Sequence, residues 1–200
     1  QNKHQLEEIS NLPASITHII HLATPSKDDS FLINFKNTLS RYMQMMGLFE
    51  ELCFLNKPKI YYMSSGSSLA RDMYSPFKKE FKILLREDPY TALKQNDEER
   101  ITLINKVLEC PTTISNLYTV LMPNQLTRPH FAISEFIKSA IEGKAINIKN
   151  PLTLRSFIGI DEVLLSIILF VSGENGFHQY SLGSPLPISM IDLGNIVIDF

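Results

Sequence analysis

The chain of 200 residues has no tryptophan, only two cysteines and almost no net charge. Cys53 and Cys110 stand far apart, in neither a Cys-x-x-Cys nor a Cys/His spacing. This argues against a zinc site or a disulfide framework and favours reduced thiols in a cytoplasmic protein. A formal net charge of −2 gives no reason to expect a nucleic-acid partner. The most apolar run, residues 163–171, is too short to cross a bilayer, and no signal peptide is recognisable, so no membrane partner is expected.

The composition is that of a globular chain. Hydrophobic residues make up 44% of the sequence and charged residues 20%, which argues against a chain that is disordered as a whole. The length suits one domain, or one large domain with a small appendage. The sequence begins at Gln1 and ends at Phe200 within an apolar helical pattern, so we expect both ends to be cut from a longer protein.

Strand and helix patterns alternate along the chain. Short apolar runs rich in β-branched residues predict buried strands at 16–23, 57–63 and 116–122, with shorter candidates at 146–148 and 156–160. Helical spacing predicts helices at about 30–54, 89–109, 130–142 and 161–170. We expect Gly143 to end the third helix and Asp161 to cap the start of the fourth. This alternation predicts an α/β fold with a mostly parallel sheet.

Residues 88–94, Asp-Pro-Tyr-Thr-Ala-Leu-Lys, place two reactive side chains four positions apart. Asp88 is a good helix N-cap and Pro89 suits the first helical position, so Tyr90 and Lys94 are predicted to share one helix face. A tyrosine acting as a base near neutral pH needs its pKa lowered from ~10 by roughly two to three units. A neighbouring ammonium can supply part of that change by opposite charge.

The surroundings of Tyr90 strengthen this hypothesis. A second Tyr-x-x-x-Lys, Tyr74 to Lys78, contains Pro76, which would break a helix between the two side chains. Ser65 follows the second predicted strand and lies 25 residues before Tyr90. In parallel α/β sheets, ligands bind at the carboxyl ends of strands, where both side chains can face one crevice. The alternative is that Tyr90 and Lys94 lie on an ordinary solvated helix face.

Six segments of the chain, in this order, resemble the extended short-chain dehydrogenase/reductases, in particular the NAD-dependent epimerase/dehydratase family that acts on nucleotide sugars. The segments are His-Ile-Ile-His-Leu-Ala at 18–23, Asn-Phe-Lys-Asn-Thr at 34–38, Ile-Tyr-Tyr-Met-Ser-Ser-Gly-Ser-Ser-Leu-Ala at 60–70, the Tyr90–Lys94 pair, Arg-Ser-Phe-Ile-Gly-Ile-Asp-Glu-Val at 155–163, and Tyr-Ser-Leu-Gly at 180–183 with Ile-Ser at 188–189. The resemblance implies a Rossmann-like, doubly wound parallel sheet, truncated at its N-terminus. It implies a partial NAD(P)-binding domain over 1–127 and a mainly substrate-binding region over 128–200, with a strand and helix near 155–171 returning to the first domain.

The resemblance also assigns roles to individual residues. Ser65, Tyr90 and Lys94 are implied to be catalytic: Ser65 would position the reacting oxygen, with Ser64 or Ser67 as substitutes if the loop register slips. The implied NAD or NADP contacts are Leu22, Ala23, Thr24, Asn34, Ser64, Tyr90 and Lys94. The implied nucleotide-sugar contacts are Ser67, Gln125 and Arg155, although Arg155 also suits an ordinary surface ion pair. His21 is expected to be a packing histidine, and no metal site is expected.

The chain departs from the family pattern in two places. No Gly-x-Gly-x-x-Gly or Gly-x-x-Gly-x-x-Gly turn, which would approach a pyrophosphate, occurs among its 8 glycines. We therefore expect roughly the first three strands to be missing, and the 200 residues alone to be poorly soluble, inactive and unable to bind a dinucleotide. At 122–129, Met122, Gln125 and Arg128 stand where the family has arginine, asparagine and glycine.

Three functions remain open on the sequence. The first is epimerase, dehydratase or reductase chemistry on a nucleotide-activated sugar in the full-length protein. The second is a degenerate member of the same fold that senses a dinucleotide or binds a partner. The third is a structural or interaction protein without a cofactor. The resemblance further implies a homodimer formed through the helices near 30–54 and 89–109.

Overall fold

The computed structural model describes residues 15–23, 34–69, 88–124, 126, 131–173 and 175–199. They fall into two compact units. The first unit is formed by residues up to 116 together with 167–180, and the second by 117–166 together with 181–200. Each unit is described by itself.

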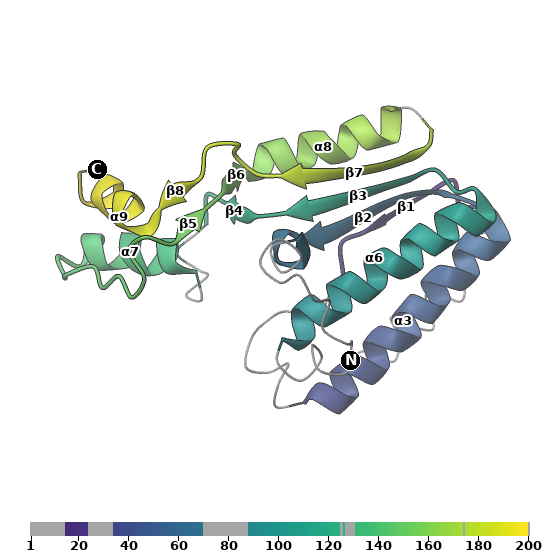
Figure 1. Ribbon diagram of the computed structural model, residues 1–200, viewed down its shortest axis with the longest axis horizontal. Helices are drawn as coiled ribbons and strands as arrows, with labels where there is room; N and C mark the ends of the chain where they lie inside the picture. Colours follow the sequence, from purple (N-terminus) through teal and green to yellow (C-terminus); the bar gives the residue numbers. More distant parts are fainter. Residues whose placement is uncertain are drawn as a thin grey trace. The chain divides into compact units, whose positions relative to one another are not determined.

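The sheet of the first unit has four strands in the order β1-β2-β3-β7. They are β1 (His18–His21), β2 (Lys59–Ser65), β3 (Thr112–Leu117) and β7 (Phe177–Leu182). β1 and β2 are parallel, with His18 opposite Lys59 and His21 opposite Tyr62, and all four arrows point the same way in Figure 1. The predicted α/β fold with a parallel sheet is therefore confirmed.

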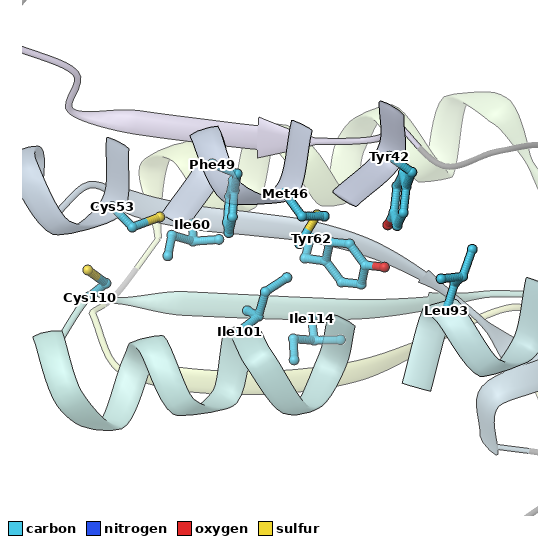
Figure 2. Packing of buried hydrophobic residues seen from close by; sticks show 10 residues of the cluster. All are labelled: Tyr42, Met46, Phe49, Cys53, Ile60, Tyr62, Leu93, Ile101, Cys110 and Ile114. Carbon is cyan, nitrogen blue, oxygen red and sulfur yellow. The ribbon is translucent and has the colours of Figure 1, made fainter. Parts of the chain in front are cut away.

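Two long helices, α3 (Phe35–Asn56) and α6 (Pro89–Leu108), cover one face of this sheet. Figure 2 shows the core between them and the sheet, formed by Tyr42, Met46, Phe49, Cys53, Ile60, Tyr62, Leu93, Ile101, Cys110 and Ile114. Tyr61 points to the opposite face, where its ring lies 5.2 Å from that of Phe170, because successive strand residues alternate between faces. The sheet is therefore buried on both sides at this strand, as the apolar run at 57–63 predicts.

Local chemistry sets the ends of α6. The Asp88 carboxylate accepts a hydrogen bond from the Thr91 backbone N–H at 3.2 Å, and Pro89 occupies the first turn. This confirms the predicted helix start. The helix ends where Glu109 adopts a left-handed conformation with φ of 56°.

The single strand predicted at 116–122 is wrong. β3 ends at Leu117, and β4 (Thr119–Leu121) is a separate strand in the second unit. The Tyr118 N–H donates to the Leu182 carbonyl at 3.0 Å, whereas the next N–H, that of Thr119, donates to the carbonyl of Ser156 at 3.2 Å. The chain thus exchanges one strand partner for another at Tyr118, and the strand is divided there.

The second unit contains two small sheets and two short helices. β4 pairs in parallel with β6 (Phe157–Gly159), and β5 (Leu154–Arg155) pairs antiparallel with β8 (Ile188–Ser189). α7 (Ala132–Ile141) and α9 (Met190–Asp199) bury a small core of Ile133, Phe136, Met190 and Leu193. α8 (Ile160–Ser172) begins in the second unit and ends in the first. No helix within the described ranges is long and apolar enough to span a membrane.

Three local predictions in this region have different outcomes. Gly143 does follow α7 in a left-handed conformation, with φ of 63°. The strand predicted at 146–148 is absent, because the isoleucines at its two ends pack against the α7–α9 core instead of pairing with a strand. Asp161 is not the cap of α8: the helix begins at Ile160, and the Glu162 carboxylate accepts the Gly159 N–H at 2.9 Å. Such a backward bond from the third helical residue satisfies a free donor at the helix start.

Candidate active site at the end of β2

A loop rich in serine follows β2 and is held by its own hydrogen bonds. β2 ends at Ser65, and residues 66–69 form one helical turn. The Ser65 hydroxyl lies 3.0 Å from that of Ser67 and accepts the Ser67 backbone N–H at 3.2 Å. The Ser68 hydroxyl donates to the Ser65 carbonyl at 2.6 Å. Ser65 is therefore presented in a defined position at the carboxyl end of a buried strand.

The first turn of α6 contacts this loop. The side chains of Tyr90 and Ser65 share a hydrogen bond. Beside it, the Thr91 hydroxyl donates to Ser67 Oγ at 3.2 Å and to Asp88 Oδ2 at 3.0 Å. The structure thus brings together two residues that are 25 positions apart in the sequence.

The protonation of Tyr90 differs from the sequence-based expectation. Burial raises the pKa of the Tyr90 hydroxyl, its hydrogen bond with Ser65 opposes that rise, and the nearby Asp88 charge adds to it. A lowered pKa was expected from the neighbouring lysine. The reason for the difference is that Lys94 is engaged elsewhere, so burial is the dominant influence on Tyr90.

Lys94 is a buried ammonium group directed at β2. Its side chain is almost fully enclosed, Nζ donates to the Met63 carbonyl at 2.5 Å, and Nζ lies 4.7 Å from the centre of the Tyr62 ring. Burial lowers the pKa of Lys94 to about 8, against the opposing charges of Asp97 and Glu98. The alternative of a solvated lysine on an exposed helix face is therefore wrong.

Glu98 joins the serine loop to the rest of the sheet. Its Oε1 accepts hydrogen bonds from the hydroxyl of Ser64, the hydroxyl of Ser68 at 2.7 Å, and the Asn116 amide at 2.8 Å. The Gln179 amide donates to Asn116 Oδ1 at 3.0 Å. The two serines on either side of Ser65 are thus tied to one carboxylate oxygen.

Sequence reasoning missed this carboxylate and its amide partners. The available signal was the position of Glu98 four residues after Lys94, since residues spaced by four lie on one helix face. Asn116 and Gln179 gave no comparable signal, because they reach the loop from β3 and β7.

The predicted cofactor contacts are spread over several elements. Leu22 and Ala23 are exposed and directly follow β1, and Asn34 is exposed at the start of α3, where its side chain makes no capping bond. Ser64 is buried, and its hydroxyl donates a hydrogen bond to the Glu98 carboxylate. Thr24 and Gln125 lie outside the described residues, as do Tyr74 and Lys78.

Two further residues singled out in the sequence have clear surroundings. Arg155 belongs to the second unit and is exposed, with Nη1 donating to the Leu154 carbonyl at 3.3 Å. His21 is buried between Phe49 and Tyr62, with ring centres 5.3 and 5.4 Å away. Burial and the Lys94 charge lower the pKa of His21 to about 4. The interpretation of His21 as a packing histidine is confirmed, and its ring is neutral near pH 7.

Several solved structures, among them two nucleotide-sugar epimerases, share the fold of this chain. The Bordetella bronchiseptica enzyme WbmF in complex with NAD+ has a TM-score of 0.75 and 19% identity over 96% of this chain. The UDP-N-acetylglucosamine 4-epimerase of Methanobrevibacter ruminantium in complex with UDP-N-acetylmuramic acid has a TM-score of 0.75, 17% identity and 96% coverage. A mutant UDP-glucuronic acid 4-epimerase of Bacillus cereus, in complex with NAD and UDP-4-deoxy-4-fluoro-glucuronic acid, has a TM-score of 0.71, 23% identity and 96% coverage.

These likenesses define the fold of the chain. The chain spans only 60%, 64% and 63% of the lengths of these three proteins. Because the structural likeness covers 96% of this chain, the Rossmann-like fold predicted from the family resemblance is confirmed. No protein-family model and no curated protein sequence matches the chain.

Proposed function

We propose that this chain carries the acid–base apparatus of an NAD(P)-dependent enzyme that acts on a nucleotide-activated sugar. The observation that carries the proposal is the hydrogen bond between Tyr90 and Ser65 at the carboxyl end of β2, with Lys94 buried one turn further along α6. Ligand chemistry in parallel α/β sheets collects at this end of the strands. The reported complexes of WbmF with NAD+ and with NAD+ and UDP support the ligand class.

The described residues fit the reactive end of a nicotinamide nucleotide. The Ser65 and Tyr90 hydroxyls meet there, the Lys94 ammonium is buried one turn further along α6, and the exposed Leu22 and Ala23 follow the neighbouring strand. Bound NAD(P) would supply the hydride acceptor or donor. The remaining assignments, with Asn34, Ser64 and Thr24 on the cofactor side and Ser67, Gln125 and Arg155 on the sugar side, belong to the same proposal.

Each of the three central residues has a distinct task in sugar oxidation. Oxidising a sugar hydroxyl removes a proton from its oxygen and a hydride from its carbon. The ionised Tyr90 oxygen takes the proton, and the Ser65 hydroxyl orients the reacting oxygen beside it. The Tyr90 phenolate needs a nearby positive charge, and Lys94, one turn further along α6, is the cation that we assign to this task. Reduction runs through the same groups in reverse.

The test is a comparison of two tyrosine variants in the full-length protein. Product mass spectrometry with a panel of nucleotide sugars and both NAD and NADP identifies the substrate and separates epimerisation, dehydration and reduction. Tyr90→Phe is expected to lower kcat by at least ~100-fold, the usual contribution of acid–base catalysis, and to leave nucleotide binding largely unchanged. Tyr180→Phe, which alters an exposed tyrosine on β7, is the matched control and is expected to retain activity. Full turnover by the Tyr90 variant would contradict the assignment.

A second function is favoured by the raised pKa of Tyr90 and the direction of Lys94 toward the Met63 carbonyl. A degenerate protein of this fold would bind a dinucleotide, or a partner, without turnover. Calorimetry separates the two functions: dinucleotide binding by the full-length protein, with no product from any sugar in the panel, supports the second.

Homodimerisation and a cytoplasmic location are part of the same proposal. Large apolar side chains are exposed on both long helices, namely Phe54 and Leu55 on α3 and Leu103 and Val107 on α6. Exposed apolar surface of this kind is typical of protein contact sites. Light scattering measures the expected dimer, and Leu103→Glu with Val107→Glu is expected to shift it toward monomer.

A further inference from the structure

Asp97 is an acidic side chain with no exposed surface, three residues after Lys94 on α6. Residues at this spacing lie on one face of a helix. Its Oδ2 accepts hydrogen bonds from two tyrosine hydroxyls, that of Tyr62 at 2.9 Å and that of Tyr42 from α3. Within the described part of the chain, Oδ1 has no hydrogen-bond partner.

The pKa of the Asp97 carboxyl is raised above its ordinary value, and the surrounding groups limit that rise. Burial raises the pKa of the Asp97 carboxyl, and the Tyr42 and Tyr62 hydroxyls, Lys94 and Arg100 all act in the opposite direction. Arg100 is itself held near by its ion pair with Glu50 at 2.7 Å. Two hydroxyls thus donate to one buried acid and two cations act on it by opposite charge, which reduces the cost of burying its charge.

Tyr62 connects this acid to Lys94. Its hydroxyl donates to Asp97, while the Lys94 Nζ lies over its ring at 4.7 Å. Tyr62 also belongs to β2, whose Met63 carbonyl accepts the Lys94 ammonium at 2.5 Å. One strand therefore fixes the position of both charged groups.

Groups on three elements, β2, β1 and α6, contact Lys94 or interact with its charge. β2 contributes Tyr62 and the Met63 carbonyl, and β1 contributes His21, whose neutral form is favoured by the Lys94 charge. α6 contributes Asp97 and Glu98. Of these two acids, Asp97 is fully buried, whereas Glu98 accepts from three donors, two in the serine loop and one on β3.

We propose that Asp97 is a positioning residue that keeps the Lys94 ammonium charged and directed at the end of β2, through the bridge formed by Tyr62. The inference rests on the proposed function, in which Lys94 supplies the charge that stabilises the Tyr90 phenolate. Asp97 itself touches neither cofactor nor substrate; it acts through Lys94.

The test measures Lys94 directly, without relying on turnover. Full-length protein labelled with ¹³C-lysine is titrated by NMR, and the Lys94 signal is identified by its loss in Lys94→Arg. Asp97→Asn keeps the shape of the side chain and removes its charge. We expect the titration of Lys94, about 8 in the parent protein, to move down by about one pH unit, the size usual for loss of a close opposite charge. The alkaline limb of kcat/KM is expected to move with it.

Two further variants keep the result decisive. Glu99→Gln removes an exposed charge from the same helix and is expected to leave the Lys94 titration unchanged. If Asp97→Asn does not fold, Tyr62→Phe removes one donor to Asp97 while keeping the ring beneath Lys94. It is expected to move the Lys94 titration in the same direction, by less. An unchanged Lys94 titration in the folded Asp97 variant, or in Tyr62→Phe where that variant replaces it, overturns the proposal. So does an equal shift in Glu99→Gln.

The outcomes also separate this proposal from the proposed function. Turnover by the parent protein with no Lys94 shift overturns the role of Asp97 alone. A Lys94 shift in a parent protein that turns over no nucleotide sugar supports the coupling of Asp97 to Lys94 and overturns the proposed function alone.

Discussion

Replacing Glu98 with alanine should destabilise the protein by about 3 kcal/mol. Hydrogen bonds to a charged group contribute ~1.5–3 kcal/mol each, and Glu98 Oε1 accepts three. They do not add fully, because Ser68 retains the Ser65 carbonyl as an acceptor and Asn116 retains the Ser68 hydroxyl. Only the buried Ser64 hydroxyl loses its acceptor without a substitute among the described residues. The protein should stay folded, since whole domains are stable by ~5–15 kcal/mol.

Urea unfolding of the full-length variants measures this loss of stability, and the m-value is expected to stay the same as in the parent protein. Glu98→Gln keeps a carbonyl acceptor but brings amide donors toward the Gln179 Nε2, which lies 3.5 Å from Glu98 Oε2, so a smaller loss of about 1 kcal/mol is expected. Glu99→Ala, an exposed position on the same helix, is the control and should cost less than ~0.5 kcal/mol.

The comparison also has a catalytic readout. Loss of the Glu98 contacts frees the hydroxyl of Ser64, next to Ser65, and leaves Ser68 with fewer contacts, so kcat should fall more than nucleotide binding. If Glu98→Ala is no less stable than Glu99→Ala, the carboxylate does not hold the serine loop, and the explanation given for the position of Ser65 is wrong.

Three further predictions follow from buried groups of the first unit. Folding lowers the pKa of His21 from 6.5 to about 4, so between these pH values the unfolded chain binds more protons than the folded one. The neutral His21 therefore contributes up to ~3 kcal/mol to the free energy of unfolding above pH 6.5, and this contribution is lost as the pH falls to 4. His21→Phe should flatten this part of the curve of stability against pH. Cys53 has no exposed surface and a pKa raised to about 12 by burial, so it should resist iodoacetamide at pH 8 until urea unfolds the protein, and labelling of the native protein would contradict its packing. Ile101→Ala should lower the free energy of unfolding by ~2–4 kcal/mol, whereas the exposed Lys106→Ala should cost far less in the same urea titration.

The features predicted correctly from the sequence depend on neighbouring residues. The start of α6 follows from Asp88 and Pro89, which act within one helical turn. The burial of β2 follows from its own apolar run. The features that were missed depend on distant partners. The predicted strand is divided at Tyr118 because the Tyr118 N–H donates to the Leu182 carbonyl whereas the Thr119 N–H donates to that of Ser156, and no local pattern reveals that exchange.

The candidate site shows the same division between local and distant causes. The spacing of Tyr90 and Lys94 on one helix is local and was predictable. The direction of the Lys94 ammonium was not, because its acceptor is a backbone carbonyl of β2. The pKa of Tyr90 likewise follows from burial, which depends on how the helix packs against the serine loop.

The bond between Gln179 and Asn116 has a consequence for how the chain matures during synthesis. Gln179 lies on β7, far downstream of the serine loop, and its amide donates to Asn116, which in turn donates to Glu98 and Ser68. A ribosome that adds ~5–20 residues per second needs on the order of ten seconds to extend from Ser65 to Gln179. The network around Ser65 is therefore completed late, after β7 has emerged and paired. Until then the nascent chain holds its serine loop without the contribution of β7.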